Sequence, residues 1–163
     1  AIYQLIDSFT LFYLCLMSKN KLKDSHFWSH SLLGAEHHAW AGLAFELLCI
    51  RHVEQIKHAL GISGVLTQNY SWRSKKKEGG AQIDLVIDRA DNCVNIVEIK
   101  FVSEPFAITA DYEQKLLNKV NCFMEETKSK KTPLLTMLTT MGIKEGTHSD
   151  IIQNEITLSD LFE

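Results

Sequence analysis

The chain has little proline, no long hydrophobic run and no excess of basic residues. Its 163 residues include two prolines and no Gly/Ser-rich linker, and this length predicts one ordinary domain. No apolar stretch reaches the roughly 18 residues that a membrane helix needs. Lys and Arg number 17 against 20 Asp and Glu, a net charge of -3. This balance excludes a protein that binds nucleic acid through bulk positive charge.

Cysteine is also sparse, and no two cysteines form a C-x-x-C pair. Each has apolar neighbours, which is typical of reduced core residues in a cytoplasmic protein. They are Cys15, Cys49, Cys93 and Cys122. No basic segment precedes the apolar run 11–17, so no signal peptide is predicted. The chain begins with Ala1 rather than Met, and we expect it to be a piece of a longer protein.

The pattern of apolar residues predicts an α/β fold. Apolar positions three or four apart predict helices, and short runs rich in β-branched residues predict strands. The order helix, three strands, helix, strand predicts a mixed sheet flanked by helices. Residues 1–35 would form an N-terminal helical extension and residues 36–163 the main domain. The predicted helices cover 8–18, 36–60 with a break near Arg51, and 109–127; the predicted strands cover 65–69, 81–88, 93–101 and 134–140.

Two neighbouring predicted strands carry charged residues within apolar runs. Such charges are costly inside a sheet unless they are paired or bind a metal. If Arg89 pairs with Cys93, a three-residue loop joins the strands and Asn92 takes its left-handed position. A one-residue slip would move Glu98 onto the apolar face, so the hydrophobic pattern selects this register. That apolar face contains Ile83, Leu85, Ile87, Val97 and Ile99.

The same register predicts that acidic side chains meet. It places Asp84 directly opposite Glu98, and Gln82 opposite Lys100. Two opposed acids repel each other unless a cation offsets them. Carboxylates favour Mg²⁺ or Mn²⁺, and the carbonyl of Ile99 could add a third ligand oxygen. Lys100 could then orient an attacking water; the alternative is a structural Lys–carboxylate pair without catalysis.

Two further acids are candidates of different kinds. Glu46 lies in the predicted helix between Phe45 and Leu47, where it either adds a third acid to the site or lies on a solvated edge. Asp88 shares a face with Asp84 but lies near the end of its strand, where an ordinary surface charge is the simpler interpretation.

A basic segment containing a tryptophan precedes the acidic strands and is predicted to be a loop. Arg and Lys can neutralise phosphates, and Trp can stack on a base. The alternative is a solvated loop with a packing Trp. Gln82 could contact a ligand, and Lys115 and Lys119 share one helix face that could extend the basic track. The predicted nucleic-acid-binding residues are Trp72, Arg73, Lys75, Lys76, Lys77, Gln82, Lys115 and Lys119.

The pattern Glu46, Asp84 and Glu98-x-Lys100 on a helix and two strands resembles the PD-(D/E)XK nuclease superfamily. The resemblance covers roughly residues 36–140 and implies a restriction-endonuclease-like αβββαβ core. It also implies hydrolysis of nucleic-acid phosphodiesters with Mg²⁺ or Mn²⁺. The implied catalytic residues are Lys100, Glu46, Asp84 and Glu98, and the implied metal ligands are Asp84, Glu98, Ile99 and Glu46.

A narrower resemblance is to the C-terminal domain of certain prokaryotic AAA+ ATPases, in which a P-loop domain and a winged helix precede a nuclease-like domain. It rests on segments 3–7, 40–46 and 72–73. It implies upstream ATPase domains in the same polypeptide, with residues 1–7 ending the winged helix. Many relatives of the superfamily are inactive, so the alternative is an idle nucleic-acid-binding or regulatory domain. The negative net charge favours substrate binding with help from a longer chain, a partner or a second copy, and DNA is favoured over RNA.

Overall fold

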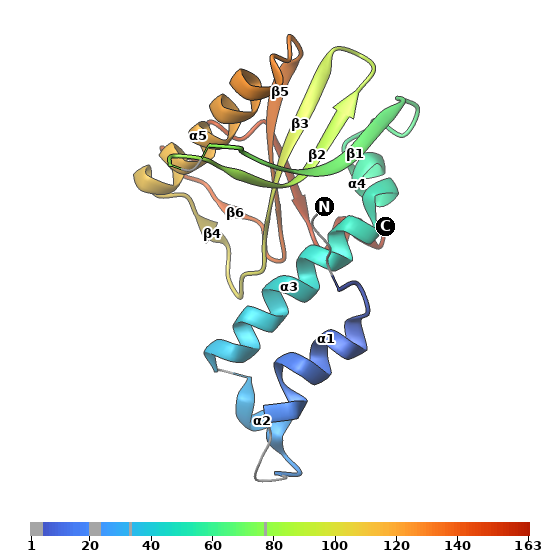
Figure 1. Ribbon diagram of the computed structural model, residues 1–163, viewed down its shortest axis with the longest axis vertical. Helices are drawn as coiled ribbons and strands as arrows, with labels where there is room; N and C mark the ends of the chain where they lie inside the picture. The colour runs from blue at the N-terminus through green and yellow to red at the C-terminus, as the bar shows by residue number, and fades with distance from the viewer. Residues whose placement is uncertain (1–4, 20–23, 33, 77) are drawn as a thin grey trace. The chain divides into compact units, whose positions relative to one another are not determined.

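The structure is a computed structural model that describes residues 5–19, 24–32, 34–76 and 78–163 (Figure 1). The chain divides into two compact units, Ala1–Leu48 and Cys49–Glu163, and the division falls inside helix α3 (Ala35–Arg51). The predicted boundary at residue 35 concerns domain organisation and stays a prediction. None of the helices in the described residues combines the length and the apolar character that crossing a membrane requires.

The first unit is helical. It contains α1 (Ser8–Cys15), the 3-10 helix η1 (Met17–Lys19), α2 (Phe27–Ser31) and most of α3. The carboxylate of Asp7 caps α1 by accepting a hydrogen bond from the Thr10 N–H at 3.3 Å. Four rings pack together with centroids 4.6 to 5.6 Å apart. They belong to Phe12, Trp28, His37 and Trp40.

The long predicted helix over 36–60 is two helices. α3 ends at Arg51 and α4 (Val53–Ala59) begins after a break at His52, close to the predicted break. Gly61 follows the second helix with a φ of 68°, a left-handed conformation that glycine adopts readily. The predicted end of this helical segment is therefore confirmed.

The second unit is an α/β structure built on a mixed five-stranded sheet. The strands lie side by side in the order β1-β2-β3-β5-β7; the first three are antiparallel, and β3, β5 and β7 are parallel. Parallel strands need a crossover, and helix α5 (Ala110–Thr127) lies in the connection between β3 and β5. The predicted α/β class with a mixed sheet flanked by helices is confirmed. The strands are β1 (Thr67–Arg73), β2 (Gln82–Arg89), β3 (Cys93–Lys100), β5 (Thr132–Thr139) and β7 (Asn154–Thr157).

Several short elements were not predicted from the sequence, among them α2 and β7. β4 (Phe106–Ala107) and β6 (Ile143–Lys144) pair in a separate two-stranded sheet, and the 3-10 helix η2 (Ser159–Leu161) lies near the end of the chain. Two-residue strands leave almost no periodicity in a sequence, so pattern analysis does not detect them.

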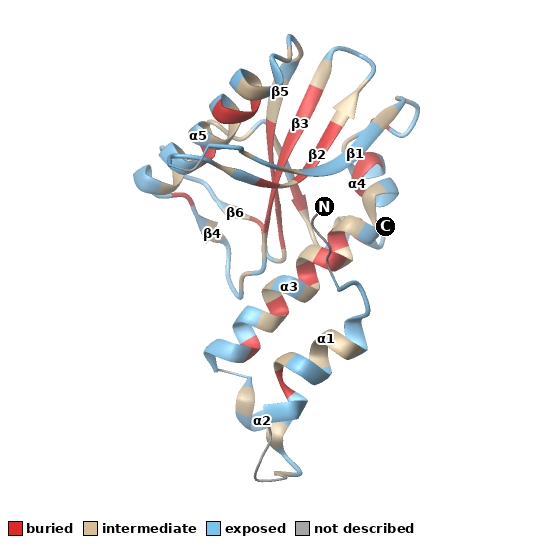
Figure 2. Ribbon diagram, in the orientation of Figure 1, coloured by how far each residue is buried: buried red, intermediate tan, exposed pale blue. Residues whose placement is uncertain are grey.

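Helix α5 packs its apolar side on one face of the sheet (Figure 2). Thr109 caps the helix by accepting a hydrogen bond from the Tyr112 N–H at 3.3 Å. Leu116 and Phe123 are fully buried against residues from three strands. Burying side chains of this size stabilises the fold by about 1.5–3 kcal/mol each. The buried strand residues in this cluster are Ile83, Val86, Val94, Ile96, Leu135 and Met137.

Ile83 was predicted on the opposite face from this cluster, and that prediction is wrong. Between the pairs Tyr70–Val86 and Trp72–Ile83 the register of β1 and β2 shifts, so β2 holds one extra residue there. Such a bulge reverses the alternation of the residues that precede it. Ile83 consequently packs in the same cluster as Val86.

The opposite face of the sheet contains a buried polar residue that was not predicted. Asn95 is fully buried and lies in register with Ile87. Its amide donates to Thr136 Oγ1 at 3.0 Å and to Asn154 Oδ1 at 3.2 Å, and its carbonyl accepts from Arg89 at 3.3 Å. These partners satisfy the amide, which lowers the cost of burying it.

The first strand differs from its predicted position. The prediction was 65–69 followed by a loop, whereas β1 continues to Arg73 through backbone pairs Trp72–Ile83 and Arg73–Gln82. The residues of β1 are mostly exposed and polar, so they lack the alternation that marks a half-buried strand. Pairing with β2, rather than local propensity, extends this strand.

Candidate active site

Asp84 of β2 and Glu98 of β3 lie just beyond one end of the pairing between these strands. The predicted register is confirmed, since Leu85 faces Val97 and Asn92 in the loop has a φ of 63°. The paired residues stop at Leu85, one residue before Asp84, where β2 carries its bulge relative to β1. Asp84 is therefore placed where the sheet is irregular, a common location for functional side chains.

The two pairs predicted to be directly opposite, Asp84–Glu98 and Gln82–Lys100, fall outside this ladder. Instead, Asp84 Oδ2 accepts a hydrogen bond from the N–H of Ile99 at 3.0 Å. Its side chain thereby reaches β3 next to Glu98, close enough for the charge of Glu98 to raise the pKa of Asp84. The acids meet as expected, although through a side-chain contact and not through paired backbones.

Glu98 is a buried carboxylate surrounded by donors. It is 4% exposed, and a charge in that environment is costly unless it is compensated. The Tyr112 hydroxyl donates to Oε1 at 2.7 Å, and the Lys119 ammonium contacts Oε2. The Lys100 ammonium lies 3.5 Å from Oε1. Three side chains from α5 and β3 therefore hold the orientation of Glu98.

Asp84 is less well compensated than its neighbour. Burial raises the pKa of its carboxyl most, and the negative charge of Glu98 raises it further. The hydrogen bond from Ile99 and the charges of Lys119 and Lys100 act in the opposite direction without cancelling the rise. The acid pair therefore favours additional positive charge, in the form of a proton or a metal ion.

Tyr112 was predicted only as a packing residue, but it belongs to this site. Burial, and then the charge and hydrogen bond of Glu98, raise the pKa of its hydroxyl strongly, so the phenol stays protonated and acts as a donor. The Lys100 ammonium lies 5.7 Å from the centre of its ring, and the ring of Phe106 packs against it at 5.0 Å. Its seven-residue spacing from Lys119 puts both on one side of α5, which is the sequence signal that could have identified the pair.

Glu46 belongs to the first compact unit, whereas the acid pair belongs to the second. It is half-buried in α3, between the buried residues Phe45 and Leu47. Its role as an accessory ligand or base stays a prediction.

The oxygen atoms near Glu98 fit a hard divalent cation. In the described part of the chain, no three His, Cys, Asp or Glu side chains group closely enough to hold a metal together. A cation here would rest on Asp84 and Glu98, with the remaining ligands from backbone or hydroxyl oxygens and water. Thr139, in register with Lys100, supplies a buried hydroxyl whose Oγ1 has no hydrogen-bond partner. The carbonyl of Ile99 stays a predicted ligand.

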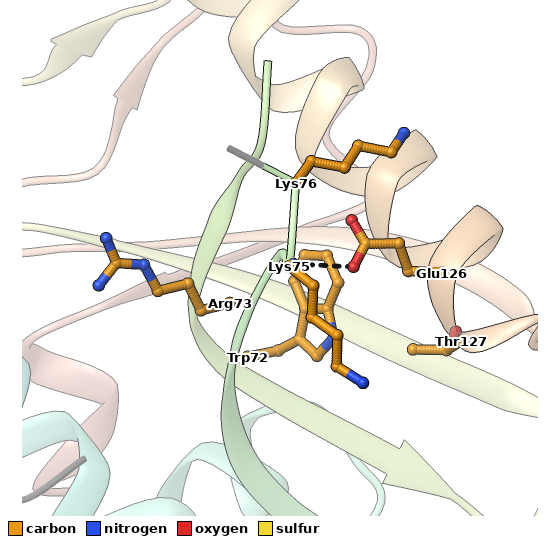
Figure 3. Close-up of a pocket in the computed structure, with 6 residues that line it drawn as sticks. All are labelled: Trp72, Arg73, Lys75, Lys76, Glu126 and Thr127. Atoms are coloured by element: carbon orange, nitrogen blue, oxygen red, sulfur yellow. Dashed lines mark hydrogen bonds between the residues drawn. The ribbon is translucent and has the colours of Figure 1, made fainter. Parts of the chain in front are cut away.

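The basic segment begins on a strand and is attached to α5. Trp72 and Arg73 are β1 residues, which corrects their predicted loop position. The indole of Trp72 packs edge-on against Phe123 at 5.4 Å, as the packing interpretation anticipated. Figure 3 shows Arg73 directed away from Glu126, the residue that anchors the following loop.

Two acids of α5 hold the loop that follows β1. Glu126 accepts hydrogen bonds from the Ser74 hydroxyl and, at 3.0 Å, from the Lys75 N–H (Figure 3). Glu125 pairs with the ammonium of Lys76 at 3.0 Å. A pocket of about 520 Å³ is lined by Trp72, Arg73, Lys75, Lys76, Glu126 and Thr127. In the described residues the side chains of Arg73 and Lys75 form no ion pair, so they are the basic groups best able to meet a phosphate.

The remaining predicted contact residues occupy different environments. Gln82 and Lys115 are exposed, and Lys77 lies outside the described residues. Lys119 contacts Glu98 rather than extending an open basic track. Asp88 pairs with Lys131 through a side-chain contact, which agrees with its interpretation as a structural surface charge.

Comparisons with protein-family models, with curated proteins and with solved structures found no match to this chain.

Proposed function

We propose that this chain is a metal-dependent nuclease-like domain that hydrolyses nucleic-acid phosphodiesters, as its resemblance to the PD-(D/E)XK superfamily implies. The observation that carries the proposal is the meeting of Asp84, Glu98 and Lys100 at one end of β2 and β3. Two acids in a partly buried setting, with a lysine beside them, form the group that such hydrolysis requires.

The order of elements supports the same proposal. A helical segment, three antiparallel strands, α5 and the parallel strand β5 follow one another in the chain. This is the order of the αβββαβ core that the resemblance implies. The acids lie on the second and third of these strands, where the superfamily pattern puts them.

The proposed chemistry is attack of water on a phosphodiester. Bound Mg²⁺ or Mn²⁺ would lower the pKa of a water and offset the charge on the phosphate. Asp84 and Glu98 would hold the ion. Lys100, 39% exposed, presents its ammonium where it can orient the water and stabilise negative charge on phosphate oxygens. The water oxygen would bond to phosphorus and lose a proton to solvent, the bond from phosphorus to the leaving oxygen would break, and that oxygen would take a proton from solvent.

The basic side chains beyond the acid pair would contact the substrate backbone. Lys119 and the loop anchor Glu126 are seven residues apart on α5, which corresponds to about 10 Å along the helix. The backbone of Lys75 bonds Glu126, and Arg73 pairs with Gln82, two residues before Asp84, so both lie within a few nucleotides of the acids. We further propose a cytoplasmic location, DNA as the favoured substrate and upstream ATPase domains in the same polypeptide, with additional affinity from those domains or from a second copy.

A specific observation favours the alternative of a catalytically idle domain. Both oxygens of Glu98 already have protein partners, Tyr112 and Lys119, so the acid can be satisfied without a metal. In that case the same fold would serve as a nucleic-acid-binding or regulatory domain.

Metal titration and cleavage assays separate these functions. Calorimetric titration with Mn²⁺ should show one saturable site in the wild type and none in Asp84→Asn. Plasmid and oligonucleotide cleavage in Mg²⁺ or Mn²⁺ should be lost in Asp84→Asn and in Lys100→Ala. Asp88→Asn is the matched control, because it removes a carboxylate of the same strand that pairs with Lys131 instead.

Three results would contradict separate parts of this proposal. Cleavage that persists in Lys100→Ala at the wild-type rate would remove the proposed water-orienting role. Saturable metal binding without cleavage by any variant would favour the idle domain. Equal loss of metal binding in Asp88→Asn and Asp84→Asn would show that the effect is not specific to the acid pair.

A further inference from the structure

Lys119 is the cation in closest contact with the acid pair. Its Nζ touches Oε2 of Glu98, whereas Nζ of Lys100 lies 3.5 Å from Oε1. The Lys119 side chain is 21% exposed and that of Glu98 is 5% exposed. The ammonium therefore covers one oxygen of a carboxylate that a metal ion would need.

The ammonium of Lys119 occupies a place that a metal ion would need. Burial and the charge of Glu98 leave Asp84 favouring positive charge, but Oε2 of Glu98 is already in contact with Lys119. A divalent cation and an ammonium at the same carboxylate oxygen repel each other. A metal ion that binds both acids therefore has to displace the ammonium.

Lys119, rather than Lys100, is the ammonium that blocks the carboxylate. Its Nζ contacts Oε2 of Glu98, and its four-carbon stem allows the ammonium to move off that oxygen. The Lys100 ammonium is farther from Glu98 and also lies over the ring of Tyr112 at 5.7 Å, so it can remain beside the acids.

A second feature next to the acids also suits a cation. Thr139 is fully buried, its Oγ1 has no hydrogen-bond partner, and its register with Lys100 puts both side chains on the same side of the sheet. A buried hydroxyl oxygen is a ligand for a hard cation or for one of its waters.

We propose that Lys119 competes with the metal ion for Glu98, an inference that rests on the proposed function. It pairs with Glu98 when the site holds no metal, and it is released when a divalent cation binds to Asp84 and Glu98. The released ammonium is then available to a substrate phosphate, which is the role that the sequence pattern indicated. Binding of the metal and binding of the polyanion would consequently favour each other.

Calorimetric Mn²⁺ titration of the full chain tests the competition. Lys119→Met should bind Mn²⁺ about ten-fold or more tightly than the wild type, because a charge-assisted hydrogen bond shifts an equilibrium by that factor. Lys119→Gln keeps a hydrogen-bond donor for Glu98 and removes the charge, so its gain in Mn²⁺ affinity should be smaller. This second variant keeps the test valid if Lys119→Met does not fold. Lys115→Met, which removes an exposed lysine one turn away, is the control for general electrostatics and should change the affinity little.

Amine labelling measures the release of Lys119 directly. Acetylation read by mass spectrometry should increase at Lys119 on addition of Mn²⁺ and stay constant at Lys115. The competition would be overturned by unchanged Mn²⁺ affinity in both Lys119 variants, or by labelling of Lys119 that does not respond to Mn²⁺. In either case, Mn²⁺ binding by the wild type would still support the proposed function. If neither the wild type nor any Lys119 variant binds Mn²⁺, the proposed function and the competition both fail.

Discussion

Replacing Tyr112 with Phe should destabilise the protein without disturbing its packing. The substitution removes only the hydroxyl that donates to Glu98 Oε1 at 2.7 Å. The ring and its contact with Phe106 at 5.0 Å remain. The change therefore isolates one hydrogen bond to a buried carboxylate.

The expected loss follows from the environment of Glu98. A hydrogen bond to a charged group contributes about 1.5–3 kcal/mol to stability. Without the hydroxyl, Oε1 of Glu98, a residue that is 4% exposed, keeps the more distant Lys100 ammonium at 3.5 Å as its neighbour. Lys119 still compensates the other oxygen, so we expect about 2 kcal/mol less free energy of unfolding. For a chain of this size, that corresponds to a fall in Tm of roughly 4–8 °C.

Urea unfolding of four proteins checks this value: the wild type, Tyr112→Phe, Glu98→Gln and the double variant. In the Glu98→Gln background the hydroxyl bonds a neutral amide, so its removal should cost about 1 kcal/mol less than in the wild type. Tyr70→Phe is the matched control, because Tyr70 is exposed and, in the described residues, its hydroxyl makes no hydrogen bond. Equal losses in Tyr112→Phe and Tyr70→Phe, or no coupling with Glu98, would refute the assigned role of the hydroxyl.

Three other substitutions test separate parts of the structure. Asp84→Asn should stabilise the protein near neutral pH. Because folding raises the pKa of Asp84, the contribution of this carboxyl to stability is full below about pH 3.8 and is lost as the pH rises through the folded-state pKa. Urea unfolding across this range should show that stability declines less with rising pH in the variant than in the wild type, and equal pH profiles would contradict the prediction. Glu126→Ala should speed hydrogen exchange of the Lys75 amide, and equal exchange in both proteins would show that Glu126 does not anchor the loop. Asn95→Ala should cost about 2–4 kcal/mol in urea unfolding, because it leaves a cavity and breaks the bond to Thr136, whereas a loss below 1 kcal/mol would mean that the buried polar group is dispensable.

Much of the sheet was predictable because strand pairing has a strict period. The loop residue Asn92 and the apolar alternation allow only one register for β2 and β3, and that register is observed. The start of α5 was also predictable, since Thr109 is a favoured N-cap residue and caps the helix as expected. These features depend on residues that are near one another in the chain.

The details of the site were less predictable because they depend on contacts across long sequence separations. The bulge in β2 depends on pairing with β1, and it moved Ile83 to the other face and ended the ladder before Asp84. Likewise, Lys119 was expected to face a phosphate, but α5 packs so that its ammonium meets Glu98 first. Local propensity carries no information on such pairings.

The sequence by itself determined that the acids of two adjoining strands and one lysine would gather at a common location, because hydrophobic alternation admits a single alignment of those strands. Only the tertiary structure decided which groups surround Glu98, since Tyr112 and Lys119 reach it from a helix that packs on the sheet. The partners of a buried carboxylate come from the element that packs over it, and the packing of the whole unit determines which element that is.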